Sequence, residues 1–313
     1  MEKLLRPTND YVFKRIFGDE SNKKVLISLL NAILQLKIKD VALLPQEIPR
    51  QGPDLKSAVL DIVAKLEDET LVDIEMQAAF HKENIDRILY YWAELFTFQA
   101  AKGQDHQILK KTISITIFDD RDHVRFFPHA HSSYKLMECH GDPVHVLTDK
   151  EEFHFIDISR VEEIAKIESN EKLIHWMKFF KSTTREEMKV LAEQDVCIGR
   201  AVQRLEIMSL DENEVYQAWA RDKFLWDQKM RERGAEERGR EEGIQIGEKK
   251  GREEGIQIGE KKGREEGREE GREEGREEGR EEGLIEAAKK LISSGMEKKA
   301  VCEMLGISES DLI

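Results

Sequence analysis

The sequence has no long uncharged apolar run. The longest one in a candidate apolar helix, Val25 to Leu36, spans 12 of the 313 residues, whereas a helix needs about 20 apolar residues to cross a bilayer. The first residues, MEKLLRPTNDYVFK, also lack the apolar stretch of a secretory signal. We therefore expect a cytoplasmic protein without a membrane-spanning segment.

Cysteine is scarce, and basic residues are outnumbered. The three cysteines, Cys139, Cys197 and Cys302, lie far apart, and an odd number cannot all pair within one chain, which is typical of a reducing compartment. The net charge of −14 disfavours a general-purpose basic nucleic-acid binder. It does not exclude a metal-dependent enzyme acting on DNA, because carboxylates that hold a metal ion add to the same acidic excess.

Several common site signatures are missing. The repeated glycines neither follow an apolar strand nor end in Lys-Ser/Thr, so a nucleotide-binding loop is excluded. A Gly-x-Ser-x-Gly nucleophile elbow is absent as well. Histidines gather between His123 and His145, near Cys139, but without the paired spacing of zinc ligands. We expect these histidines to be polar residues of loops and strands, with a structural zinc site as the lesser alternative.

Charged residues make up 36% of the chain, against about 25% in a typical domain, and the excess lies after Arg231. Twelve glycines occupy every fourth position from Gly239 to Gly283, in REEG, IQIG and EKKG units. Each glycine costs a helix about 0.8–1 kcal/mol relative to alanine, more than the few tenths gained per opposite-charge pair. We therefore expect a solvated spacer. The alternative is a helical stalk whose glycine stripe promotes self-association.

Composition divides the chain into four parts. Residues 1–160 alternate helical and strand patterns, residues 161–230 are helical only, residues 231–283 form the charged repeat, and residues 284–313 form a small helical unit. The last unit has the outline of a helix-turn-helix, but residues 308–313 are too short for a helix that reads a DNA groove. A cap that binds a partner is at least as consistent with this pattern.

The segment Lys56 to Phe80 predicts a β-hairpin. Apolar residues alternate with polar ones from Leu60 to Leu66 and again from Val72 to Ala78, and the polar residues 67–70 can form the turn. Burying all apolar members together fixes the register. In this register Asp61 lies opposite Glu75, Val63 opposite Asp73, and Val59 opposite Gln77.

Two carboxylates directly opposite each other weaken a sheet unless a cation lies between them. A hard divalent ion such as Mg²⁺ takes one or two carboxylates together with carbonyl and water oxygens. Asp61, Glu75 and the carbonyl of Met76 are therefore candidate ligands. The alternative is that the alternating acids lie on the solvent-exposed face of a strand and bind no metal.

Two helices flank this hairpin in the sequence. Val25 to Leu34 is predicted to be a core helix. In the second helix, Ile85 to Gln99, the predicted core face carries Ile85, Ile88, Leu89, Trp92 and Phe96, and the other side carries Arg87, Tyr91 and Glu94. Arg87 could contact a DNA phosphate, pair with a site carboxylate, or form a surface salt bridge.

Four segments carry a family resemblance in their order along the chain: Thr8 to Leu34, Leu60 to Gln77, Asn84 to Gly103 and Thr112 to Asp120. Together they resemble the PD-(D/E)XK nuclease superfamily, and within it the Rpn family of recombination-promoting nucleases, also called putative transposases. The resemblance implies an α/β restriction-endonuclease-like core, with a mixed sheet flanked by helices, over residues 1–160. The helical region, the glycine repeat and the small terminal unit would follow it.

The resemblance also implies an activity. The chain would be a Mg²⁺-dependent endonuclease (Mn²⁺ also possible) that hydrolyses DNA phosphodiester bonds in recombination or transposition, with Asp61 and Glu75 as metal ligands. Gln77 would stand where most of the superfamily has a lysine, so a neutral amide would replace an ammonium. Asp10 and Glu20 are both candidates for an acid from the first helix.

The resemblance implies DNA as a partner, and the glycine stripe makes further copies of the chain a possible second partner through residues 231–283. The alternative function is a catalytically weak or inactive nuclease fold that acts as an interaction module through its helices and its charged repeat.

Overall fold

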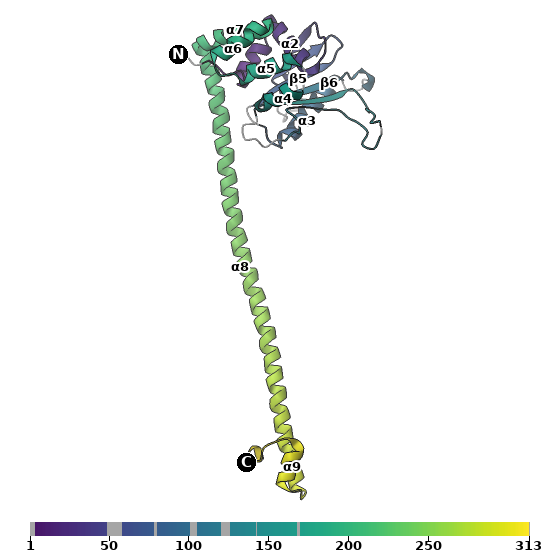
Figure 1. Cartoon of the computed structure of the whole chain (residues 1–313), viewed down its shortest axis with the longest axis vertical. Coiled ribbons are helices and arrows are strands. Elements are labelled where there is room, and N and C mark those ends of the chain that lie inside the picture. Colours follow the sequence, from purple (N-terminus) through teal and green to yellow (C-terminus); the bar gives the residue numbers. More distant parts are fainter. Residues whose placement is uncertain are drawn as a thin grey trace. The chain divides into compact units, whose positions relative to one another are not determined.

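The computed structural model describes residues 4–48, 58–77, 80–100, 105–119, 126–141, 143–167 and 170–312. The chain forms two compact units, Met1–Gln228 and Lys229–Ile313, and Figure 1 labels several of their elements. The predicted site residues all lie in the first unit. The predicted domain boundaries at residues 160, 230 and 283 stay predictions.

A mixed six-stranded sheet forms the centre of the first unit, in the order β1-β4-β5-β6-β8-β7. Its strands are β1 (Val41–Leu44), β4 (Ile62–Leu66), β5 (Leu71–Gln77), β6 (Thr112–Phe118), β7 (His131–Tyr134) and β8 (Glu151–Asp157). β5, β6 and β8 run parallel, whereas β1, β4 and β7 join by antiparallel pairing. This mixed sheet confirms the predicted α/β core.

The predicted hairpin is present as β4 and β5, and Val63 pairs with Asp73 in the predicted register. The polar turn adopts a positive φ of 70° at Glu69. One predicted pair is wrong, because Val59 pairs with Glu47 instead of Gln77. The chain bends at Asp61, so the preceding strand β3 (Ala58–Val59) leaves the main sheet and joins β2 (Glu47–Ile48) in a separate two-stranded sheet.

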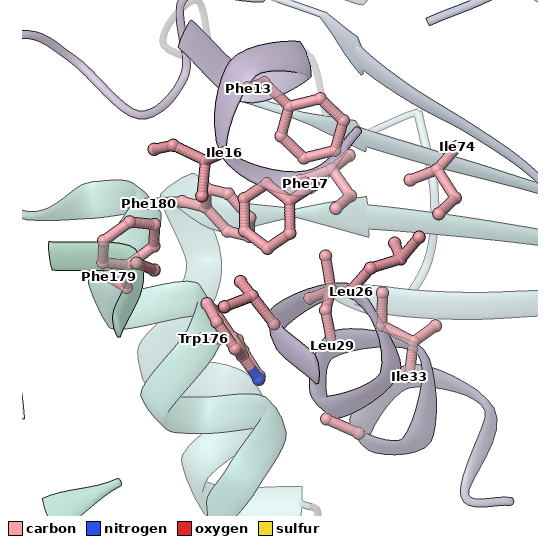
Figure 2. Close-up of a cluster of buried hydrophobic side chains, with 14 of the residues drawn as sticks. Phe13, Ile16, Phe17, Leu26, Leu29, Ile33, Ile74, Trp176, Phe179 and Phe180 are labelled. Atoms are coloured by element: carbon pink, nitrogen blue, oxygen red, sulfur yellow. The ribbon is translucent and has the colours of Figure 1, made fainter. Parts of the chain in front are cut away.

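Helices cover one face of the sheet and share a single hydrophobic core with it. These are α1 (Asp10–Phe17), α2 (Lys23–Leu34), α4 (Val161–Ile167), α5 (Glu171–Lys181), α6 (Arg185–Gln194) and α7 (Val196–Leu210), with the short 3₁₀ helices η1 (Glu20–Asn22) and η3 (Ile158–Arg160). In Figure 2, Phe17 of α1 lies beside Trp176 of α5, with ring centroids 5.5 Å apart. α2 confirms the predicted core helix, and α5 packs into the same cluster.

The helix α3 (Asn84–Phe98) packs against the other face of the sheet, followed by η2 (His106–Ile108). Ile88 and Leu95 are buried, and Tyr91 packs with Leu95 against the hairpin. The prediction for Leu89 is wrong, since this residue is 44% exposed. Helical spacing defines which residues share an apolar face but not the angle at which that face packs against a sheet. Here Tyr91, on the side predicted to be polar, is one of the residues that contact the hairpin.

α8 (Glu212–Ser293) begins in the first unit and continues through the glycine repeat. We expected a spacer without stable helix, but the repeat is helical, and all its residues from 239 to 283 are exposed. The repeat contains no proline, so the helical hydrogen bonds continue through it. α9 (Lys298–Leu305) and η4 (Glu309–Leu312) end the described chain. None of the described helices is long and apolar enough to span a membrane.

The first turns of α8 bind α1 through polar side chains. Asn9 Nδ2 donates to the carbonyl of Ala218 at 3.0 Å and to Asp222 Oδ1 at 2.7 Å. One turn earlier on α8, Glu214 accepts from Tyr11 Oη at 2.7 Å and from Arg15 Nη2 at 2.6 Å. This segment of α8 therefore completes the first unit.

We predict that a chain ending at Gln228 keeps the thermal stability of the first unit, whereas a chain ending at Leu210 loses it. The shorter chain lacks the partners of Asn9, Tyr11 and Arg15, and each such hydrogen bond contributes about 0.5–1.5 kcal/mol. Thermal unfolding followed by circular dichroism measures the difference. Equal melting temperatures for the two chains would contradict a structural role for this part of α8.

Candidate active site

Asp61 and Glu75 lie side by side at the end of the β4–β5 hairpin. Asp61 is the residue before β4, and its backbone N–H donates to Glu75 Oε1 at 2.9 Å. In return, the backbone N–H of Met76 donates to Asp61 Oδ2 at 3.0 Å. Each carboxylate is thus oriented by the strand that carries the other. The structure brings together the two residues that the sequence pattern placed opposite each other.

Gln77, the third predicted site residue, follows Glu75 on the same face of β5. Its Oε1 accepts a hydrogen bond from Asn84 Nδ2 at 3.0 Å, and the residue is buried. Asn84 is the first residue of α3. The start of α3 therefore fixes the orientation of a neutral amide beside the two carboxylates.

A lysine that the sequence analysis did not identify contacts the pair. Lys14 Nζ lies 2.8 Å from Asp61 Oδ1, with the lysine side chain 26% exposed and the aspartate side chain 11% exposed. Lys14 belongs to α1, which precedes the hairpin by more than 40 residues. The sequence places Lys14 one helical turn after Asp10, on the same face of α1. It contains no signal that this face lies against Asp61.

The structure distinguishes the two candidate acids of the first helix. Asp10 is buried, its negative charge raises the pKa of Asp61, and its Oδ2 accepts from Arg221 Nε at 2.5 Å. Glu20 instead pairs with Lys23 at 2.7 Å at the surface. Of the two acids, Asp10 is therefore the one that lies near the carboxylate pair.

Asp73 is a further acid that the sequence analysis did not assign to the site. It points to the same face of β5 as Glu75, and the alternation in LVDIEMQ could have indicated this. Asp73 is fully buried, and Ser114 Oγ on β6 lies 3.5 Å from its Oδ2. Within the described ranges, its Oδ1 and Thr116 Oγ1 are buried oxygens without a hydrogen-bond partner. Thr116 lies beside Glu75 in the β5–β6 register.

The three acids share one electrostatic environment. Burial raises the pKa of Asp61, partly offset by the Lys14 ammonium. Burial and the neighbouring Asp61 charge hold the pKa of Asp73 well above its usual range, and burial together with Asp73 and Asp61 does the same for Glu75. The charge of Arg87 on α3 acts in the opposite direction and lowers the pKa of Glu75. Arg87 is thus close enough to this acid for its charge to matter.

The donor set fits a hard divalent ion. Asp61 and Glu75 offer only oxygen atoms, and Mg²⁺ is typically held by one or two carboxylates with water completing the shell. The unpartnered Asp73 Oδ1 and the mutual repulsion of buried acids indicate a site that is short of positive charge. In the part of the chain that is described, no group of three or more His, Cys, Asp or Glu residues could hold a metal ion. An ion at this site would therefore have at most two of these acids as ligands.

Two histidines, His131 and His154, belong to a separate polar cluster. His131 Nε2 and His154 Nδ1 are 2.9 Å apart, and His154 Nε2 lies 3.0 Å from Glu152 Oε1, which also pairs with Lys111. Burial lowers the pKa of His131 to about 4. Glu152 pairs with Ile113, which in turn lies beside Val72 in the sheet register. The cluster is therefore near the start of β5, and Gln77 is at its end.

We predict that Asp73→Asn stabilises the metal-free protein at pH 8 and that this gain disappears near pH 4. When folding raises the pKa of an acid, the acid destabilises the folded state increasingly as the pH rises from the pKa of the unfolded chain, about 3.9 for aspartate, through the raised pKa of the folded state. The variant removes this loss. Melting temperatures in EDTA across this range test the prediction, with the exposed Asp40→Asn as a matched control. A variant less stable than wild type at pH 8 would contradict it.

A family model described as PD-(D/E)XK nuclease family transposase matches residues 7–235. The match includes Asp61, Glu75 and Gln77 and ends within α8, before most of the glycine repeat. No curated protein and no solved structure matches the chain significantly. The chain belongs to the PD-(D/E)XK nuclease family transposases, a family that includes Rpn-like proteins.

Proposed function

We propose that this protein is a metal-dependent endonuclease that hydrolyses DNA phosphodiester bonds in recombination or transposition. Asp61 and Glu75 bind Mg²⁺, which Mn²⁺ can replace, and Gln77 acts beside them. The observation that carries the proposal is the reciprocal hydrogen bonding of Asp61 and Glu75 through the backbone N–H groups of Asp61 and Met76. Family membership supports the same class of reaction.

Each site residue has a role that follows from its chemistry. Asp61 and Glu75 present oxygen ligands whose directions are fixed before any metal arrives, because backbone donors already hold them. A bound divalent ion lowers the pKa of a water molecule and stabilises charge on the phosphate. Gln77, held through its Oε1 by Asn84, keeps its two amide N–H donors for the attacking water or a phosphate oxygen.

Basic residues beside the site support binding of a phosphate backbone. Lys82 and Arg87 are exposed, in the segment after β5 and on the first turns of α3. Side chains of this kind position nucleic acid through phosphate contacts without reading its sequence. Since the whole chain carries a net charge of −14, DNA binding depends on this local basic group and weakens as salt increases.

We predict that Asp61→Asn lowers Mg²⁺-dependent cleavage of supercoiled plasmid by at least about 100-fold. Loss of a metal ligand should exceed the 10–100-fold loss typical of a residue that only orients a ligand. The control is Asp40→Asn, which makes the same chemical change at an exposed position and should leave cleavage unchanged. Gel analysis of nicked and linear products measures the rates.

A calorimetric titration with Mg²⁺ or Mn²⁺ distinguishes this proposal from its alternative. Metal binding that is lost in Glu75→Gln supports a working site. If wild type neither binds metal nor cleaves DNA, the nuclease proposal fails. The chain would then act as an interaction module on a nuclease fold.

One observation favours an assembly role in addition to catalysis. The glycine repeat lies in a helix whose side chains are all exposed between residues 239 and 283, and a Cβ atom added at any of its twelve glycines would meet nothing within 4 Å. Two such helices could therefore approach closely along the glycine stripe. We propose that residues 231–283 bring copies of the chain together.

We predict that the full chain sediments as a dimer or larger assembly, whereas a chain ending at Gln228 sediments as a monomer. The truncation keeps the contacts between α8 and α1 intact, so the first unit should stay folded. Analytical ultracentrifugation at several concentrations measures both masses. Two monomers would exclude self-association through the repeat.

A further inference from the structure

Lys14 occupies a special place among the basic residues of the first unit. Its ammonium lies 2.8 Å from Asp61 Oδ1. Within the described residues, no other lysine or arginine forms an ion pair of this kind with Asp61 or Glu75. Arg87 influences Glu75 only through its charge, without a direct contact to it. Lys14 is therefore the cation that directly contacts the carboxylate pair.

The fold fixes the position of Lys14 on two sides. Phe13 and Phe17 insert the neighbouring face of α1 into the core, where Figure 2 shows them close to Phe180 of α5. On another face, Arg15 is bound to Glu214 of α8. The backbone that carries Lys14 is thus held between the core and α8, which makes its contact with Asp61 part of the folded unit and not a chance surface pair.

The proposed reaction needs a positive charge that position 77 does not supply. Negative charge builds up on the phosphate oxygens during hydrolysis, and preorganised donors aimed at that charge are a major source of rate. Gln77 is neutral, with its Oε1 engaged by Asn84. A lysine ammonium brings a full charge and three N–H donors.

We propose that Lys14 is a catalytic residue that supplies this charge, an inference that rests on the proposed nuclease function. Its ammonium pairs with Asp61 in the metal-free protein. When a divalent ion engages Asp61, the ammonium donates to a non-bridging oxygen of the scissile phosphate. Lys14 transfers no proton: the water oxygen forms a bond to phosphorus as the bond from phosphorus to the deoxyribose oxygen breaks, the attacking water gives a proton to bulk solvent, and the leaving oxygen takes one from it.

The proposal predicts opposite effects of one substitution on two properties. Lys14 competes with a divalent ion for the charge of Asp61, so removing its ammonium should tighten metal binding. The same change removes a phosphate contact, so it should slow cleavage. A lysine with a purely structural role would weaken both properties together, because a distorted site binds metal less well.

The experiment compares Lys14→Met with Lys23→Met in the full chain. Lys23 is also a paired lysine, 2.7 Å from Glu20, but on α2 at the surface, so its variant controls for loss of an ion pair. In calorimetry, Lys14→Met should bind Mn²⁺ several-fold more tightly than wild type, and Mn²⁺ should raise its melting temperature by more. At saturating Mn²⁺ and DNA, its cleavage rate should fall about 100-fold or more.

A second variant tests whether position 77 can take over the charge. The double variant with Lys14→Met and Gln77→Lys should cleave DNA at least about tenfold faster than Lys14→Met alone, because an ammonium returns to the site from β5. No recovery, together with weaker Mn²⁺ binding in Lys14→Met, would overturn the proposal and leave Lys14 as a structural residue.

The outcomes separate this inference from the proposed function. If wild type and Lys14→Met cleave DNA equally, the role of Lys14 is wrong while the nuclease function stands. If wild type binds Mn²⁺ but cleaves no DNA, the nuclease function is wrong, and the catalytic role of Lys14 is wrong with it.

Discussion

The candidate site depends on three neighbouring acids, Asp61, Asp73 and Glu75, that share too little positive charge. Burial raises the pKa of all three acids, the charge of Asp61 further raises the pKa of Asp73, and the charges of Asp73 and Asp61 further raise the pKa of Glu75. A fold keeps such an arrangement at a cost in stability, since buried carboxylates without partners are unfavourable. A cation relieves this cost, and in the metal-free chain the Lys14 ammonium supplies part of the positive charge that the acids lack. The local instability of the site and the metal binding that we propose for it therefore have the same physical origin.

α1 connects the core, the site and the beginning of α8. Its apolar face lies in the core, its Asp10 and Lys14 lie near Asp61, and its remaining polar side chains bind the first turns of α8. The Asp10 carboxylate itself is bound by Arg221 of α8. Any movement of this part of α8 therefore acts on the same short helix that carries the cation of the site.

Much of the hairpin could be predicted because its information is local. Alternating apolar residues define both strands, and burying them on one side leaves a single register, in which Val63 faces Asp73 as the structure has it. The predicted Val59–Gln77 pair failed because alternation does not reveal a bend, and the bend at Asp61 takes β3 into another sheet. The prediction that Leu89 lies in the core was wrong for a related reason, because helical spacing does not specify the angle at which a helix packs against a sheet.

The sequence by itself determined the two facing carboxylates, the neutral amide after them, and the charged glycine repeat, because each is a short-range pattern of residue types. Only the tertiary structure decided which other side chains join the site. Lys14 and Asp10 come from the first helix, and Ser114 and Thr116 come from a strand about 40 residues after the hairpin. Their meeting depends on the order of strands and the packing of α1, which are long-range consequences of burying one common core.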